Sequence, residues 1–201
     1  MNPALLLTLS SFLLLGFTTN LPLAFSHEKV HDFQGVPISS AGQYLIKPTV
    51  FGPTGGGVRL GFPSNSTCQV AIQQDENEVS PSLAVKFNII GQSPGAIFTG
   101  TPLNIAFVDK PKCATSSKWV VVVDDFPSKW LGIGGAQDHP GLKQIITGNF
   151  NIQKYDLGYK LVFCPTSTGP CSDITRHADK DGRRLVLTNT DSPFEVSFIK
   201  R

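Results

Sequence analysis

The sequence is poor in charged side chains, and it lacks the apolar spacing of a helix. Charged residues make up 16% of the 201 residues, and the formal net charge is +2 at pH 7. A charge this small and this scattered argues against nucleic acid and anionic membranes as partners. Beyond the first 26 residues there is also no apolar run long enough to cross a bilayer. The missing helical spacing favours a domain of strands and turns.

No charged side chain precedes Glu28, and residues 4–17 are nearly all Leu, Phe and small residues. This pattern predicts a signal peptide at residues 1–26. Its apolar core is too short to span a membrane, and Ala24-Phe25-Ser26 offers the small residues at which a signal peptidase cuts. A buried N-terminal strand is the alternative. With cleavage after Ser26, residues 27–201 form one secreted domain, destined for the extracellular space (apoplast) or the vacuole.

The sequence has only four cysteines: Cys68, Cys113, Cys164 and Cys171. In an oxidising compartment an even number of cysteines predicts disulfides, here two. Three pairings are open. Pairing in chain order is favoured because Cys164 and Cys171 flank a Thr-Gly-Pro turn. A zinc site is disfavoured because the spacing and the neighbouring histidines do not fit four ligands. We therefore expect no metal and no cofactor.

The triplet Asn65-Ser66-Thr67 is an N-glycosylation sequon. It can be used only in the secretory lumen, which the signal peptide implies. We therefore predict a glycan on Asn65, although pairing of the nearby Cys68 is a competing constraint.

Short apolar runs, many of them of period two, alternate with Gly, Pro, Asn and Asp from Val30 onward. Their number and spacing predict an all-β barrel or sandwich. The predicted strands cover residues 43–47, 58–62, 69–73, 84–89, 103–108, 119–123, 150–153, 159–163, 184–188 and 194–199.

A weak internal repeat favours a β-trefoil among these folds. Residues 57–60 precede residues 68–72 much as residues 182–185 precede residues 194–198. Both blocks follow a strand that begins with tyrosine, at Tyr44 and at Tyr159. A middle third, with the predicted strands at 103–108 and 119–123, would complete three repeats.

Several longer motifs resemble one family. The opening segment Val-His-Asp-Phe-Gln-Gly at residues 30–35, continuing to Ile38, Tyr44 and Ile46, is similar to the signature of the plant Kunitz-type (soybean trypsin inhibitor-like) protease inhibitor family. Further similar segments are residues 159–165, 181–185 and 193–198. The resemblance extends over essentially the whole mature chain. It implies a β-trefoil of twelve strands in three pseudo-repeats, with Cys68 paired to Cys113 and Cys164 to Cys171.

The resemblance also implies a function. Such a protein is not an enzyme; it blocks the active site of a secreted protease with a rigid exposed loop. A loop already held in a cleavable shape loses little entropy on binding, so a modest contact area gives tight association. A monomer that binds a serine protease is expected, with cysteine and aspartic proteases as alternative partners. The competing interpretation is a non-inhibitory relative, such as a storage or defence protein, or a binder of another hydrolase such as an amylase or invertase.

The inhibitory loop is expected between the strand that ends near Asn88 and the strand that begins near Leu103. Its predicted tip is Gln92, Ser93 and Pro94. Alignment back from Leu103 places Ser93 at the specificity position, whereas alignment forward from Cys68 places Gln92 there. Neither side chain is basic, and the buried carboxylate in the S1 pocket of trypsin requires Arg or Lys. The sequence therefore does not predict strong trypsin inhibition.

Two further residues depart from the family pattern. Ser40 stands where the family commonly has an asparagine that braces the reactive loop, and a serine hydroxyl reaches less far. Pro94 follows Ser93 directly, so this bond has no N–H on its leaving-group side, and the residue before it is conformationally restricted.

Residues 91–95 also spell the G-x-S-x-G pattern of serine hydrolases. Pro94 argues against this chemistry, since the oxyanion hole of that motif uses the N–H of the residue after the serine. Asp138 with His139, or Asp173 with His177, lies downstream in the right chain order, but Asp and His are too common for that order to carry weight. We interpret His139 as a surface residue.

Trp119 and Trp130 would be sugar-stacking platforms in a lectin of the same fold. No Gln-x-Trp repeat accompanies them, so we expect Trp119 in the core.

Overall fold

The structure, a computed structural model, describes residues 27–50, 52, 54–63, 66–141, 143–166, 169–189 and 192–201. The predicted signal peptide and Asn65 lie outside the described residues. In chain order the elements are β1 (Tyr44–Pro48), β2 (Val58–Gly61), β3 (Ala71–Gln74), β4 (Ala84–Ile89), β5 (Leu103–Phe107), β6 (Trp119–Val123), β7 (Trp130–Ile133), the 3-10 turn η1 (Ala136–Asp138), β8 (Gln144–Ile146), β9 (Gly148–Tyr155), β10 (Gly158–Pro165), β11 (Ser172–Asp179), β12 (Gly182–Thr188) and β13 (Glu195–Lys200).

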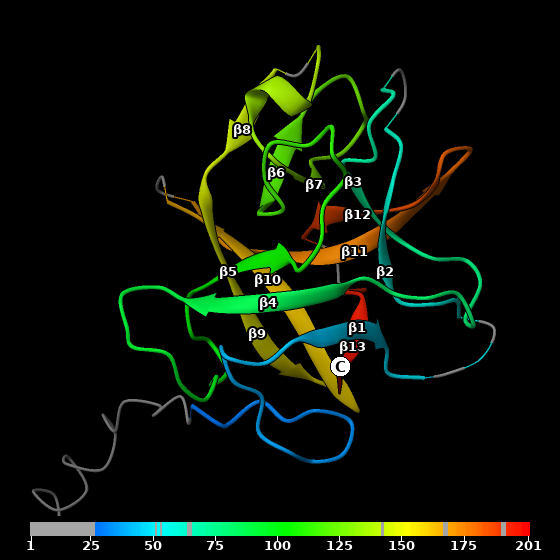
Figure 1. Ribbon diagram of the computed structural model, residues 1–201. Coiled ribbons are helices and arrows are strands. Elements are labelled where there is room, and N and C mark those ends of the chain that lie inside the picture. The colour runs from blue at the N-terminus through cyan, green and yellow to red at the C-terminus, as the bar shows by residue number, and fades with distance from the viewer. Residues whose placement is uncertain are drawn as a thin grey trace, which may run out of the picture.

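Six strands close a barrel and three hairpins cap one end of it. The barrel runs β13-β1-β4-β5-β9-β10 and is closed by the pairing of β10 with β13. The hairpins β2–β3, β6–β7 and β11–β12 are joined to one another by pairings among β3, β7 and β12. In Figure 1 the barrel strands β1, β4, β9 and β13 lie below the cap strands β3, β6, β7 and β12. Each third of the chain supplies two barrel strands and one hairpin, which confirms the β-trefoil.

The structure has thirteen strands in its described part where twelve were expected. The difference lies in β8 and β9, which only Thr147 separates. β8 pairs with the cap strand β6 and β9 with barrel strands β5 and β10. Together they occupy the place of one strand that passes from cap to barrel, so the threefold arrangement is unaffected.

Alternating burial explains how these segments form the barrel. In β5 the side chains of Leu103, Ile105 and Phe107 are buried while those between them are half-buried, as expected for a strand with one face toward a core. Trp119 packs inside with its ring perpendicular to that of Phe150, at 6.0 Å between centroids. The expectation of a core position for Trp119 is confirmed.

The internal repeat seen in the sequence is out of register by one strand. It matches β2 with β12, whereas the topology makes β12 the counterpart of β3. β2 follows Gly57 and β12 begins with Gly182, so the similarity reflects a glycine at the start of each strand. The two tyrosines do occupy equivalent strands of the first and third repeats: Tyr44 is the first residue of β1, and Tyr159 is the second residue of β10.

Three strands escaped the sequence analysis: β7, β8 and β11. Every residue of β7 is buried, so the strand has no alternation of buried and exposed residues, and its Gly132 weakens the intrinsic preference for a strand. The strand β11 is largely polar, with Ile174 as its one fully buried residue. Partner strands rather than intrinsic preference determine such segments.

The cysteines form two disulfides. Cys68 bonds to Cys113 with 5.9 Å between their Cα atoms, and Cys164 bonds to Cys171 with 4.1 Å. The first joins the segment before β3 to the connection between β5 and β6, and the second closes the turn between β10 and β11. None of the cysteines is free.

The interpretation of His139 as a surface residue is wrong. Its side chain is only 4% exposed. The ring nitrogen Nε2 lies 2.9 Å from the carbonyl oxygen of Ile133, and the ring packs against the edge of Trp130. Burial lowers the pKa of His139, outweighing the opposing effect of that hydrogen bond and of the nearby Asp138 and Asp124 carboxylates.

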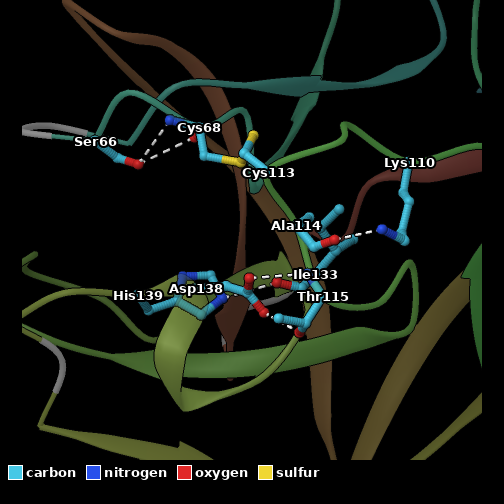
Figure 2. Close-up of a disulfide and its surroundings, with 9 residues drawn as sticks. All are labelled: Ser66, Cys68, Lys110, Cys113, Ala114, Thr115, Ile133, Asp138 and His139. Carbon is cyan, nitrogen blue, oxygen red and sulfur yellow. Dashed lines mark hydrogen bonds between the residues drawn. A yellow bond between two sulfur atoms is a disulfide. The ribbon is translucent and has the colours of Figure 1, made fainter.

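Asp138, the neighbour of His139, fastens η1 to the loop that carries Cys113. Figure 2 shows its carboxylate facing Thr115. The backbone N–H of Thr115 donates to it at 2.9 Å, the Thr115 hydroxyl donates as well, and the N–H of Gly135 donates at 2.7 Å. Burial alone would raise the pKa of Asp138, but these hydrogen bonds together lower it. The carboxylate is therefore a structural anchor.

Candidate functional site

The connection from β4 to β5, residues 90–102, joins two barrel strands from different repeats. In Figure 1 it projects at the left from the end of β4, and the first described residues of the chain meet it there. Residues 91–95 are exposed, whereas Ile97 is completely buried. The loop therefore has an accessible tip and an arm that is rooted in the core.

The predicted tip residues Gln92, Ser93 and Pro94 are all exposed. The tip is bent rather than straight: Gly91 has a φ of +72°, a left-handed conformation that favours glycine. Within the described residues, neither Ser93 nor Gln92 makes a side-chain hydrogen bond to a histidine or a carboxylate. The tip can present a peptide bond to a partner, but it holds no assembled catalytic group.

The second arm of the loop pairs with residues 38–40. The N–H of Ser40 donates to the carbonyl of Gly95 at 3.0 Å, and the N–H of Ile97 donates to the carbonyl of Ile38 at 3.0 Å. The N–H of Gly95 in turn donates to the hydroxyl of Ser40, also at 3.0 Å. Ser40 thus touches the loop through both its backbone and its side chain, directly after the exposed tip.

The same arm pairs further down with residues 27–30. The N–H of Val30 donates to the carbonyl of Ile97 at 2.9 Å, and the N–H of Thr99 donates to the carbonyl of Glu28 at 2.8 Å. The N–H of Glu28 donates to the Thr99 hydroxyl at 3.1 Å, and Nδ1 of His27 lies 2.7 Å from the carbonyl oxygen of Thr99. The sequence does not predict this second contact, because the exposed polar residues 27–29 form no recognisable pattern.

Two tyrosines hold the N-terminal segment that carries both contacts. The hydroxyl of Tyr44 accepts the N–H of Ser39, and the hydroxyl of Tyr159 accepts the N–H of His31, each at 2.9 Å. Asp32 closes the intervening turn by accepting the N–H groups of two residues that follow it. The opening motif at residues 30–35 therefore fixes the position of the N-terminal segment to which the loop is hydrogen-bonded.

The described part of the chain shows no other candidate centre of a familiar kind. No group of three or more His, Cys, Asp or Glu side chains is placed there to hold a metal ion. No helix in that part is long and apolar enough to cross a membrane.

The fold and the supported loop define a β-trefoil with an exposed connection between its first and second repeats, and comparison with known proteins identifies the class. The sequence profile of the legume Kunitz family, described as trypsin and protease inhibitor, matches residues 30–200. The chain belongs to this family, as its motifs indicated. The family consists of protease inhibitors rather than enzymes.

Individual relatives agree. The Kunitz-type trypsin inhibitor-like 1 protein of Pisum sativum is 50% identical over 207 aligned residues, which cover 100% of this chain and 94% of the relative. The subtilisin inhibitor CLSI-II of Canavalia lineata is 47% identical over 176 residues, 85% of this chain and 90% of the relative. The crystal structure of a Kunitz type trypsin inhibitor from Cicer arietinum superposes with a TM-score of 0.82 at 48% identity, covering 87% of this chain and 99% of that one.

Proposed function

We propose that the protein inhibits a serine protease by placing residues 91–95 in the active site of the enzyme. The observation that carries this proposal is the loop itself: an exposed tip on an arm that is hydrogen-bonded to Ser40 at one end and to residues 27–30 at the other. An arm held in this way has little conformational entropy left to lose when it binds. The protease would therefore meet a rigid segment of peptide that resembles a substrate.

We assign the specificity position to Gln92, with Ser93 as the alternative. The bond from Ser93 to Pro94 is a tertiary amide without an N–H, a poor leaving side for a protease. The bond from Gln92 to Ser93 has no such defect. Both candidates are uncharged, which suits a protease whose S1 pocket lacks a carboxylate, such as the subtilisin named for the Canavalia relative. Trypsin would bind weakly, because its buried S1 carboxylate would stay unpaired.

A second candidate function is a non-inhibitory role in storage or defence, or the binding of another hydrolase such as an amylase or invertase. The left-handed Gly91 favours it, because a bend beside Gln92 interrupts the extended backbone that a protease reads. Ser40 in place of the family asparagine points the same way.

The proposal includes secretion. Residues 1–26 would be removed after Ser26, Asn65 would carry a glycan, and the mature protein would act as a monomer outside the cell or in the vacuole. The support for this is the sequence pattern and the two disulfides, which require an oxidising compartment to form.

The test is to express the full sequence in a secreting host, purify the product, and assay it against subtilisin, elastase, chymotrypsin, trypsin, papain and pepsin. We expect one-to-one competitive inhibition of a serine protease with an uncharged S1 pocket. Absence of inhibition across the panel would overturn the proposal and favour the second candidate. N-terminal sequencing and the mass of the same product test the cleavage site and the glycan.

A further inference from the structure

We propose that residues 27–30 are a positioning strand that sets the rigidity of the loop, so that loss of the first few residues of the mature chain weakens the inhibitor. This inference rests on the proposed function and on cleavage after Ser26. It concerns a different element from Ser40, which holds the loop near its tip. An exopeptidase that removes one to three N-terminal residues would therefore regulate inhibition.

The second arm of the loop lies between two unlike partners. Toward the tip, Ala96 pairs with Ser39. Ser39 lies in a segment that is held at both ends by hydrogen bonds to the hydroxyls of the barrel residues Tyr44 and Tyr159. Toward the base, Phe98 pairs with Lys29, which belongs to the free end of the mature chain. The two pairings overlap only at Ile97, which bonds to Ile38 through its N–H and to Val30 through its carbonyl.

At the base of the arm, the described hydrogen bonds of Thr99 all go to residues of the N-terminal strand. The N–H, the carbonyl and the hydroxyl of Thr99 all bond to Glu28 or His27. Removal of residues 27–29 would leave these three groups to water while the contacts of Ser40 stayed in place. The arm would then be fastened at one end only.

The ring of His27 also packs at the point where the loop turns back to the barrel. Gly100 there has a φ of +76°, and a Cβ added to it would lie 3.5 Å from Cε1 of His27. The N–H of Gly100 donates to the carbonyl of Ile152 in β9 at 2.9 Å. The N-terminal strand thus closes over the junction between the loop and the barrel.

Exposure makes this strand removable. His27, Glu28 and Lys29 are all exposed, whereas Val30 is completely buried. The part of the positioning strand before Val30, residues 27–29, carries no buried side chain. Such a terminal segment opens at little cost and is a preferred site of proteolytic attack. Trimming would therefore stop at Val30 and leave the barrel intact.

The experiment compares the secreted protein with two variants made from the full sequence, one lacking residues 27–29 and one with His27→Ala, Glu28→Ala and Lys29→Ala together. The triple variant is the matched control, because it keeps the backbone pairing and loses only the contact of the His27 ring. Three quantities are measured: amide hydrogen exchange over residues 90–100, the inhibition constant for subtilisin, and the thermal midpoint.

For the deletion we expect roughly tenfold faster exchange in the loop and a roughly tenfold higher inhibition constant, as the loss of several modest hydrogen bonds implies. The thermal midpoint should shift by only a few degrees, the shift expected when an equilibrium constant of a domain of this size changes roughly tenfold. The triple alanine variant should stay within about threefold of the wild type in both exchange and inhibition. Unchanged loop exchange in the deletion variant, or an equal effect in the control, would overturn the proposal.

The outcomes separate this inference from the proposed function. If the wild type inhibits no protease but the deletion loosens the loop, the positioning strand stands and the proposed function fails. If the wild type and the deletion inhibit equally, the positioning strand fails and the function stands. Should the deletion variant not fold, Thr99→Val decides instead, because it removes the acceptor of the Glu28 N–H without shortening the chain; faster loop exchange supports the inference and unchanged exchange refutes it.

Discussion

The hydroxyl of Ser40 accepts a hydrogen bond from the backbone N–H of Gly95 at 3.0 Å, across 55 residues of sequence. Gly95 comes directly after the exposed tip of the loop, and the backbone N–H of Ser40 returns a bond to the Gly95 carbonyl. The side chain of Ser40 therefore bonds to the backbone of the loop after Pro94 and not to Gln92, Ser93 or Pro94. These three tip residues remain accessible to the active site of a protease.

Ser40→Ala removes one of these bonds and leaves the backbone pair intact. We predict a roughly fivefold higher inhibition constant for subtilisin, as expected for one hydrogen bond of about 1 kcal/mol. Ser39→Ala is the control, since the described contacts include no bond from the Ser39 hydroxyl to the loop. Equal effects of the two substitutions would show that Ser40 does not brace the arm.

An arginine at the loop tip tests which residue enters the S1 pocket. We expect Gln92→Arg to create trypsin inhibition, because the guanidinium pairs with the buried carboxylate of that pocket. Ser93→Arg should gain little, since Pro94 follows it. Both proteins are assayed against trypsin under identical conditions. A gain from Ser93→Arg alone would move the specificity position by one residue, and no gain from either would favour a loop that has lost its inhibitory shape.

Asp138→Ala should destabilise the protein by about 2 kcal/mol, because it removes the acceptor of three hydrogen bonds from Thr115 and Gly135. The pKa of Asp138 is lowered below its ordinary value of 3.8. Its stabilising contribution is therefore complete above that pH and is lost as the pH falls through the folded-state pKa. Urea unfolding measures both effects. Asp125→Asn, which breaks only the exposed pair with Lys143, should change neither; a similar loss in this control would contradict the assignment.

His139 predicts a second pH effect at a higher pH. Burial lowers its pKa from 6.5, so the unfolded chain takes up a proton before the folded chain does. Stability should therefore decrease as the pH falls below about 6.5, until the folded-state pKa is reached. Unfolding midpoints between about pH 7 and pH 5 should show this slope in the wild type and a smaller one in His139→Gln. Identical slopes would mean that the folded and unfolded chains bind this proton equally, so that burial does not lower the pKa of His139.

Much of the fold could be predicted from the sequence because barrel strands such as β5 alternate buried residues with half-buried ones, the buried ones here being Leu103, Ile105 and Phe107. The strands β7 and β11 could not be predicted from the sequence. One is buried on both faces and the other is largely polar, so neither carries a period of two. The burial of His139 depends on the ring of Trp130 and the carbonyl of Ile133, two nearby groups that face the imidazole only once β7 and η1 have folded.

The connection between β4 and β5 could be located from the two strong strands that flank it, and Ser40 was singled out by its place in the opening motif. The support from residues 27–30 was not predicted, because backbone groups make most of it and any residue supplies those. The bend at Gly91 was also beyond the sequence, since glycine permits a positive φ without requiring it.

The inhibition constant for subtilisin, measured for the wild type and for a variant with Gln92→Gly, Ser93→Gly and Pro94→Gly, tests the central claim most directly. We expect one-to-one competitive inhibition by the wild type and a loss of roughly a hundredfold or more in the variant, because the tip would lose both its contacts and its rigidity. Equal inhibition by the two proteins, or none by the wild type at micromolar concentration, would contradict it.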